Sequence, residues 1–304
     1  MPGFINPSVL MKNILVITGG AGFIGSNIIS ELLKFKKFKI ISVDNYSSGL
    51  SKNHIKHKRV KYLKGNTKNI EILLKAYVDK IHSIFHFGEF ARIYQSFKKI
   101  NECFSSNIEG SSNVFNFALK NKIKLIYSAT SASLGNGGKD MNLSPYAFSK
   151  AKNLELLENL KKWFNFRYEV IYFYNVYGER QICKGDMATV VGIFEDHFNK
   201  GKKLPVVKPG TQDRRFTHVL DTVKACIFAW RKNKCKHYSV ASKQSYSIIE
   251  LAKLFGNKIR YLPKRAGERY SSALTKMNLN NKIIRLPAKI RLKNYVNNFL
   301  MDNH

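Results

Sequence analysis

A glycine-rich segment near the N-terminus constrains the fold of this chain more than any other feature. Residues 19–25 contain both G-x-G-x-x-G and G-x-x-G-x-x-G, directly after the strand-like run at 14–18. Glycine there lets the chain turn tightly and approach a pyrophosphate, and the following helix offers free N–H groups to the anion. Asp44 ends the next strand-like run, where its carboxylate can bind the ribose hydroxyls and repel a 2′-phosphate. This order predicts a site for NAD rather than NADP.

The rest of the chain has the alternation of a parallel, doubly wound sheet. Strand-like runs and one-sided helical segments alternate, the runs at 14–18, 40–43, 81–87, 124–128 and 168–172, the helical segments at 24–34, 69–78, 102–121 and 146–164. The pattern predicts an α/β fold with a Rossmann-like doubly wound parallel sheet.

The sequence pattern predicts a leader and two domains. Residues 1–10 precede a second methionine and read as a leader, and residues 11–178 read as the NAD-binding domain. After Gly178 the apolar runs become irregular and are interrupted by glycine and proline residues. We therefore expect residues 179–304 to form mainly a smaller C-terminal substrate-binding domain, with a segment around 211–241 returning to the first domain.

Composition limits the partners and the setting. The 304 residues include 52 Lys and Arg against 20 Asp and Glu, a net charge of +32, but the basic residues are scattered along the chain. Scatter favours a solvated surface over a specific nucleic-acid site. The four cysteines lack metal-ligand spacing and do not make a disulfide framework, which predicts a reducing, cytoplasmic setting without a metal. No apolar stretch approaches the roughly 18–20 residues of a membrane span, so no membrane partner is expected.

A second group of chemically capable residues lies beyond the predicted strand at 124–128. Tyr146 and Lys150 are four residues apart and so share one helical face, where the ammonium can lower the phenol pKa and make Tyr146 a base. Thr130 lies among hydroxyl residues at the strand end, and doubly wound sheets place ligands outside those ends. Hydroxyl, phenol and lysine are thus expected beside the dinucleotide.

Further motifs in the same order resemble one family. They are His86-Phe87-Gly88, Asn107-Ile108-Glu109-Gly110, Phe173-Tyr174-Asn175-Val176-Tyr177-Gly178, Arg214-Arg215-Phe216-Thr217-His218-Val219 and Arg265-Ala266-Gly267-Glu268. With the glycine turn and Tyr146, they are similar to extended short-chain dehydrogenases/reductases of the NAD-dependent sugar-nucleotide epimerase/dehydratase group, closest to UDP-hexose 4-epimerases.

The resemblance implies a role for each matching residue. The cofactor-binding set is Gly19, Gly22, Phe23, Ile24, Gly25, Asp44, Asn45, Asn66, Thr67, Phe87, Asn107, Tyr146, Lys150 and Tyr174. The catalytic set is Thr130, Tyr146 and Lys150, and the substrate-binding set is Thr130, Asn175, Arg214, Arg265 and Glu268. It also implies a homodimer through the helices at 102–121 and 146–164.

The two residues after Thr130 decide the choice of reaction. Dehydratases of this group carry an Asp-Glu pair there, whereas this chain has Ser131 and Ala132, which cannot act as that acid and base. The expected reaction is therefore epimerisation, at C4 of a UDP-hexose or UDP-N-acetylhexosamine, through a transient keto-sugar formed with NAD.

Two alternatives and one residue stay open. Residues 177–188 resemble the segment of ADP-heptose 6-epimerases that carries an additional catalytic lysine, here Lys184, although a solvated lysine fits as well. A non-catalytic dinucleotide- or nucleic-acid-binding protein would explain the +32 charge but not Tyr146 and Lys150. Glu89 could serve the nicotinamide or the sugar, or it could be a solvent-facing acid of a loop.

Overall fold

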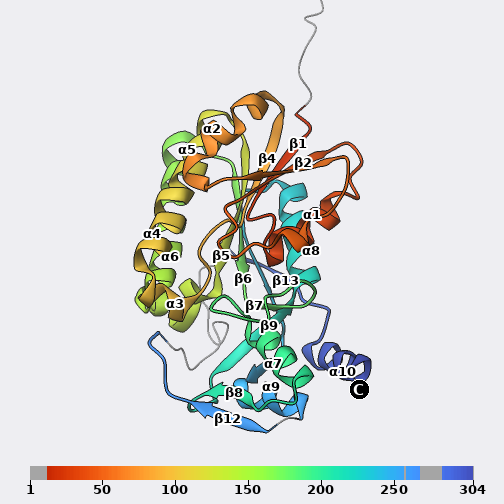
Figure 1. The fold of residues 1–304 in the computed structure, drawn as a ribbon. Coiled ribbons are helices and arrows are strands. Elements are labelled where there is room, and N and C mark those ends of the chain that lie inside the picture. The colour runs from red at the N-terminus through yellow and green to blue at the C-terminus, as the bar shows by residue number, and fades with distance from the viewer. Residues whose placement is uncertain (1–11, 257, 268–282, 304) are drawn as a thin grey trace, which may run out of the picture.

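A parallel sheet of eight strands forms the centre of the molecule (Figure 1). The computed structural model describes residues 12–256, 258–267 and 283–303. The sheet order is β13-β10-β6-β5-β4-β1-β2-β3. Its strands are β1 (Ile14–Thr18), β2 (Lys39–Asp44), β3 (Val60–Lys64), β4 (Ile81–His86), β5 (Lys124–Thr130), β6 (Tyr168–Phe173), β10 (His237–Ala241) and β13 (Ile283–Pro287). The chain passes from one side of β1 to the other between β3 and β4, which opens the crevice where such sheets bind ligands.

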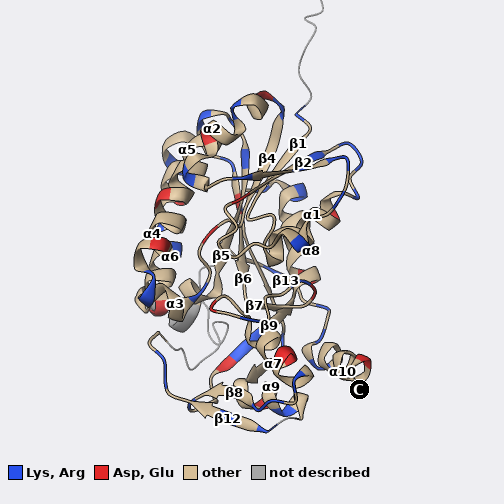
Figure 2. Ribbon diagram, viewed as in Figure 1, with Lys and Arg blue, Asp and Glu red and all other residues tan. Residues whose placement is uncertain are grey.

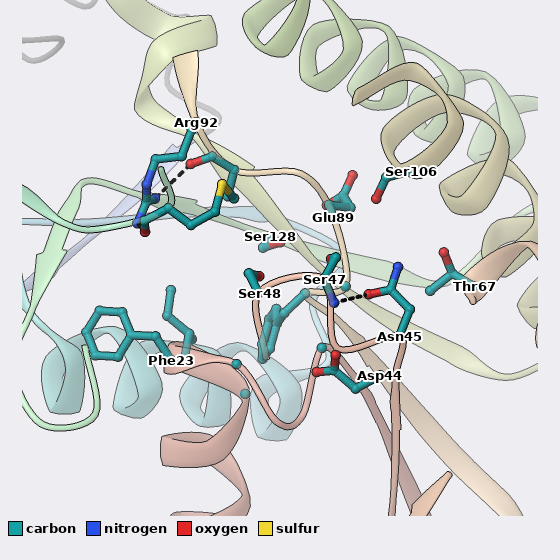
Figure 3. Close-up of a pocket in the computed structure, with 18 of the residues that line it drawn as sticks. Phe23, Asp44, Asn45, Ser47, Ser48, Thr67, Glu89, Arg92, Ser106 and Ser128 are labelled. Carbon is teal, nitrogen blue, oxygen red and sulfur yellow. Dashed lines mark hydrogen bonds between the residues drawn. The ribbon is translucent and has the colours of Figure 1, made fainter. Parts of the chain in front are cut away.

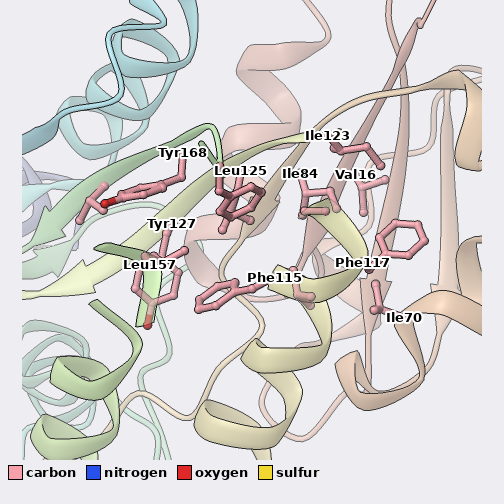
Figure 4. Packing of buried hydrophobic residues seen from close by; sticks show 14 of the residues in the cluster. Val16, Ile70, Ile84, Phe115, Phe117, Ile123, Leu125, Tyr127, Leu157 and Tyr168 are labelled. Carbon is pink, nitrogen blue, oxygen red and sulfur yellow. The ribbon is translucent and has the colours of Figure 1, made fainter. Parts of the chain in front are cut away.

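Helices cover both faces of this sheet (Figure 1). One face carries α2 (Ile70–Leu74), α3 (Ile93–Lys98), α4 (Ile100–Phe104), α5 (Ser111–Lys120) and α6 (Pro145–Phe164), and the other carries α1 (Phe23–Leu32) and α8 (Val219–Lys232). Alternate side chains of β1 serve the two faces, because successive residues of a strand point to opposite sides. Val16 packs into the core that holds Phe115 and Tyr127 (Figure 4), whereas Leu15 packs into the core that holds Trp230.

Shorter helical turns link these elements. They are the 3₁₀ segments η1 (Ser51–Asn53), η2 (Thr67–Asn69), η3 (Lys75–Lys80) and η5 (Ser131–Asn142), and the π-helical segment η4 (Ser105–Gly110) between α4 and α5.

The second region packs against the carboxyl ends of the strands. It contains two small sheets, β11-β9-β7 and β12-β8, and a core of its own around Phe194 and Phe255. Its strands are β7 (Asn175–Tyr177), β8 (Leu204–Val207), β9 (Asp213–His218), β11 (Ser245–Ser247) and β12 (Ile259–Leu262), and its helices are α7 (Val190–Asn199), α9 (Ile248–Phe255) and α10 (Leu292–Asp302). Within the described ranges, no helix is both long and apolar enough to cross a membrane.

The predicted fold class is confirmed, and the differences lie at its edges. The main sheet gains β3 and β13, which the sequence pattern did not predict. Both are edge strands whose side chains are only partly buried, so neither shows the apolar run of a central strand. Within the segment at 211–241, β10 lies in the main sheet and α8 covers one of its faces (Figure 1), whereas β9 belongs to a small sheet; β13 comes from the range 179–304. The proposed leader at 1–10 lies outside the described residues.

Candidate active site

The glycine turn between β1 and α1 is shaped for a close backbone approach. Gly19 has φ +71° and donates its N–H to Val43 O at 2.8 Å. A Cβ at Gly19 would lie 2.9 Å from the Gly88 backbone nitrogen, and one at Gly25 would lie 2.0 Å from Gly19 O. Neither position can take a larger residue without moving backbone. The turn therefore keeps the N-terminus of α1 open to a pyrophosphate.

Asp44 is held rigidly at the end of β2. Its Oδ2 accepts the Ala21 N–H at 2.9 Å and its Oδ1 accepts the Tyr46 N–H at 2.8 Å. Burial raises the pKa of the Asp44 carboxyl, and these two N–H groups oppose that rise. A Cβ at Gly49 would lie 2.7 Å from Asp44 Oδ1, so glycine leaves room for the carboxylate. The carboxylate is thus aimed into the pocket beside Asn45 (Figure 3).

This pocket gathers most of the residues predicted to bind the cofactor. Those lining it are Gly19, Gly22, Phe23, Ile24, Gly25, Asp44, Asn45, Thr67, Phe87, Tyr146 and Lys150. Residues from β1, β2 and β4 and from α6 thus converge on one cavity. The open glycine turn and the Asp44 carboxylate anchored beside it fit the pyrophosphate and ribose of NAD.

Three predicted cofactor residues do not line the pocket. Asn66 caps η2 by accepting the Lys68 N–H at 3.0 Å. The Asn107 amide is used by the Phe90 backbone, accepting its N–H at 2.6 Å and donating to its carbonyl at 3.0 Å. The Tyr174 hydroxyl contacts Ser239 Oγ at 2.9 Å. In this structure these side chains hold neighbouring segments in place.

Tyr146 is buried at the first turn of α6 and hydrogen-bonds to Thr130. Ser144 caps this helix by accepting the Ala147 N–H at 3.1 Å, and Pro145 occupies its first turn. Burial raises the pKa of Tyr146 to about 12; the Thr130 bond lowers it and Glu89 raises it. Lys150, which the sequence predicted to lower this pKa, is not among these groups, and its ammonium is paired with Glu89.

Lys150 forms a buried ion pair with Glu89 and also donates to the Ser128 carbonyl. The Lys150 and Glu89 side chains are 4% and 2% exposed. Glu89 is therefore not a solvent-facing acid of a loop. Sequence reasoning left its role open because the two residues are 61 positions apart and only the sheet brings them together.

Arg92 is a pocket residue that the sequence motifs did not reveal. It lies at the N-terminus of α3, donates to Ala91 O at 2.8 Å, and also donates to Met187 O. Its Nε is buried without a hydrogen-bond partner. Arg92 lines both the NAD pocket and a second cleft beside it.

That second cleft contains most of the predicted substrate residues. Asn175, Arg214 and Arg265 line it together with Arg92 and apolar side chains such as Phe216. Three guanidinium groups facing one cleft suit a diphosphate, because each offers a planar fork of donors. Of the two other predicted substrate residues, Thr130 lines neither this cleft nor the NAD pocket, and Glu268 lies outside the described residues.

Comparison with known proteins identifies the family. The model of the NAD dependent epimerase/dehydratase family matches residues 15–241. The chain belongs to this family. ADP-L-glycero-D-manno-heptose-6-epimerase of Brachyspira hyodysenteriae is 30% identical over 79% of this chain and 79% of that protein. The putative UDP-glucose 4-epimerase of Methanocaldococcus jannaschii is 28% identical over 84% of this chain and 88% of that protein.

A solved structure supports the same assignment. UDP-N-acetylglucosamine 4-epimerase from Methanobrevibacter ruminantium M1 superposes with a TM-score of 0.83 at 25% identity, covering 97% of this chain and 100% of that one. The predicted family and the NAD dependence are therefore confirmed.

Lys184, a possible catalytic lysine by sequence, lies at the surface in an ion pair. Its side chain is 71% exposed and pairs with Asp196 at 3.4 Å. Asp196 also pairs with Lys200 at 2.6 Å. In this arrangement Lys184 lines neither the NAD pocket nor the arginine-lined cleft.

Proposed function

We propose that this protein catalyses NAD-dependent epimerisation of a nucleotide sugar, at C4 of a UDP-hexose or UDP-N-acetylhexosamine. The observation that carries the proposal is the position of Tyr146. Its phenol is buried against Thr130 and lines the NAD pocket, and Arg92 borders both this pocket and the arginine-lined cleft. A sugar whose diphosphate lies among Arg214 and Arg265 would extend toward the phenol.

Each side chain then has a task that its contacts support. Tyr146 takes the proton of the sugar hydroxyl, and Thr130, bonded to the phenol, orients that hydroxyl and shares the proton. Lys150 holds the nicotinamide ribose from the pocket wall. NAD, when bound, supplies a hydride acceptor that returns the hydride after the ketose has turned over.

The alternatives have less support. A dehydratase needs an acid and a base after Thr130, where Ser131 and Ala132 stand. A 6-epimerase that uses Lys184 needs that ammonium near the sugar, but it pairs with Asp196 at the surface. A non-catalytic protein gives no reason for Tyr146 and Lys150 to line one pocket.

We also propose a homodimer and a reducing, cytoplasmic setting. Apolar side chains lie exposed on and beside the expected dimer helices, with Phe97 at 42%, Ile100 at 45% and Ile108 at 37% exposure. All four cysteines are free thiols, which suits a reducing compartment. Sedimentation equilibrium tests the dimer, and a monomer at micromolar concentration would contradict it.

A panel of nucleotide sugars tests the proposed reaction. The purified protein is incubated with NAD and with UDP-glucose, UDP-galactose, their N-acetyl counterparts and an ADP-heptose, and the products are resolved by chromatography. Interconversion of a UDP-sugar pair is expected. Conversion of the ADP-heptose alone would instead support the 6-epimerase.

A further inference from the structure

The positive charge of Lys150 is balanced before any ligand binds. Its ammonium pairs with the Glu89 carboxylate in a site where both side chains are almost fully buried. Water cannot screen either charge there, so each acts mainly on the other and on its nearest neighbours. A third group nearby therefore experiences the Lys150–Glu89 pair as a dipole and not as a net charge.

Other donors hold Glu89 as an acceptor. Its Oε1 accepts from Ser111 Oγ at 2.9 Å, from the Tyr127 hydroxyl at 3.0 Å and from Asn153 Nδ2 at 3.2 Å. Burial raises the pKa of Tyr127 well above its ordinary value, so Tyr127 remains a donor. Together with the Lys150 ammonium, these three donors fix the position of the Glu89 carboxyl group.

Arg92, unlike Lys150, is not paired with a carboxylate within the described chain. Its nitrogens reach only the Ala91 and Met187 carbonyls, and within the described chain no carboxylate contacts it. Asp186, the nearest acid in sequence to Met187, instead accepts from Gln95 Nε2 at 3.1 Å. A buried guanidinium without a counter-ion is costly unless it acts on another group.

The Tyr146 phenol is that group. The elements around it present few charges: Thr130 and Tyr127 from β5, Cys103 from α4, Glu89 after β4, Arg92 before α3 and Lys150 from α6 itself. Burial raises the pKa of Cys103 to about 11, which keeps that thiol neutral. Figure 3 shows Arg92 and Glu89 on the side of the pocket that faces Phe23 and Asp44.

We propose that Glu89 and Arg92 control the ionisation of Tyr146: Glu89 cancels the charge of Lys150, and Arg92, which no carboxylate of the described residues contacts, is the cation that stabilises the phenolate. The inference rests on the proposed role of Tyr146 as the base. Glu89 and Arg92 are tuning residues that act through the phenol. Because Glu89 cancels the charge of Lys150 and burial disfavours the phenolate, Tyr146 stays protonated in the free protein.

Titration of the free protein tests this proposal. Tyrosinate absorbance is followed against pH for the parent, Glu89→Gln, Glu89→Gln/Arg92→Met and Glu89→Gln/Arg92→Lys. The matching Tyr146→Phe protein is subtracted from each, so that only the Tyr146 signal remains. Glu89→Gln should lower the apparent pKa of Tyr146 by about one unit or more, because a nearby negative charge is removed. Adding Arg92→Met should reverse this lowering of the Tyr146 pKa, because the second charge is removed. Adding Arg92→Lys should leave most of the lowering in place, because the positive charge is kept.

A matched control removes the same charge elsewhere. Glu102→Gln breaks an exposed pair with Lys99, where the Glu102 side chain is 63% exposed, and should leave the titration unchanged. If Glu89→Gln does not fold, Arg92→Met alone should move the acid limb of the turnover profile upward by about one pH unit.

The outcomes separate this proposal from the proposed function. The proposal would be overturned if Tyr146 titrated identically in Glu89→Gln and in the parent. It would also be overturned if the Tyr146 pKa stayed lowered in Glu89→Gln/Arg92→Met. If only Arg92→Met can be measured, an unmoved acid limb would overturn it. The titration uses neither cofactor nor sugar, so failure of every sugar nucleotide to react would refute the proposed function and leave the titration result standing.

Discussion

Asp44 has both carboxylate oxygens fixed by backbone N–H groups, so its charge cannot move away from the ribose site. Asp44→Asn should weaken NAD binding about tenfold or more, since a hydrogen bond to a charged group contributes about 1.5–3 kcal/mol. The same change should narrow the preference for NAD over NADP. Isothermal titration with both cofactors measures this, and Asp79→Asn makes the same chemical change at an exposed position. An unchanged NAD to NADP ratio would contradict the role given to Asp44.

His86 makes stability depend on pH. Its Nδ1 lies 2.7 Å from Thr18 Oγ1 and its Nε2 lies 2.9 Å from Ser111 Oγ, and burial lowers its pKa to about 4. The unfolded pKa is about 6.5, so the neutral ring stabilises the fold fully above that pH and loses this contribution as pH falls toward 4.

The expected loss from His86 is about 3 kcal/mol of unfolding free energy. Urea unfolding of the parent at several pH values measures it. His86→Gln should flatten the pH dependence between pH 6.5 and pH 4, whereas His57→Gln, at an exposed histidine, should not. Equal slopes for the parent and His86→Gln would show that His86 is not the group responsible.

At the scale of elements, a second buried ion pair ties β5 to β6. Lys124 Nζ lies 3.2 Å from Glu169 Oε1, with side-chain exposures of 4% and 0%, and donates to Trp230 O of α8 at 2.7 Å. Lys124→Met would leave a buried carboxylate that still accepts the N–H groups of Cys235 and Lys236 but has lost its ammonium partner. The expected cost is about 3–5 kcal/mol of unfolding free energy.

Urea denaturation checks this cost against a matched surface pair. Lys120 and Glu71 also form an ion pair, at 2.7 Å, but their side chains are 69% and 65% exposed. Lys120→Met should change the unfolding free energy by no more than about 1 kcal/mol. Comparable effects of the two substitutions would refute the stabilising role of the β5–β6 pair.

The sequence predicted the elements that are buried or begin with strong local signals. The apolar runs of β1, β4 and β5 and the glycine turn before α1 were sufficient for the central sheet and the NAD pocket. The edge strands β3 and β13 were not predicted, because partly exposed strands do not need a continuous apolar sequence. The π-helical η4 was not predicted either, since a π turn changes which residues share a face. Asn107, within η4, binds the Phe90 backbone and does not line the pocket.

The electrostatics of the site could not be predicted from motif spacing. Tyr146 and Lys150 do share a pocket, as their four-residue spacing suggested. However, the partner of Lys150 is Glu89, which reaches it only because β4 and β5 lie side by side. Arg92 carries no motif, and its importance comes from the lack of a counter-ion in the described part of the folded chain.

At the scale of the whole molecule, the +32 charge is distributed over every layer of the fold (Figure 2). We therefore predict only weak binding to DNA, which should weaken steeply as salt rises, because scattered lysines contact phosphates without reading bases. Fluorescence anisotropy with two unrelated duplexes across a salt series measures this. Sequence-selective binding that persists at moderate salt would show a dedicated nucleic-acid site.

Tyr146 is the group on which the proposed reaction depends most, because it exchanges a proton with the sugar. The direct test compares turnover of the parent and Tyr146→Phe on the nucleotide sugar that the parent converts. We predict a loss of at least about a hundredfold, the lower range for a general acid/base, with NAD affinity and unfolding free energy nearly unchanged because only the phenol oxygen is removed. Turnover by Tyr146→Phe equal to that of the parent would contradict the proposed mechanism.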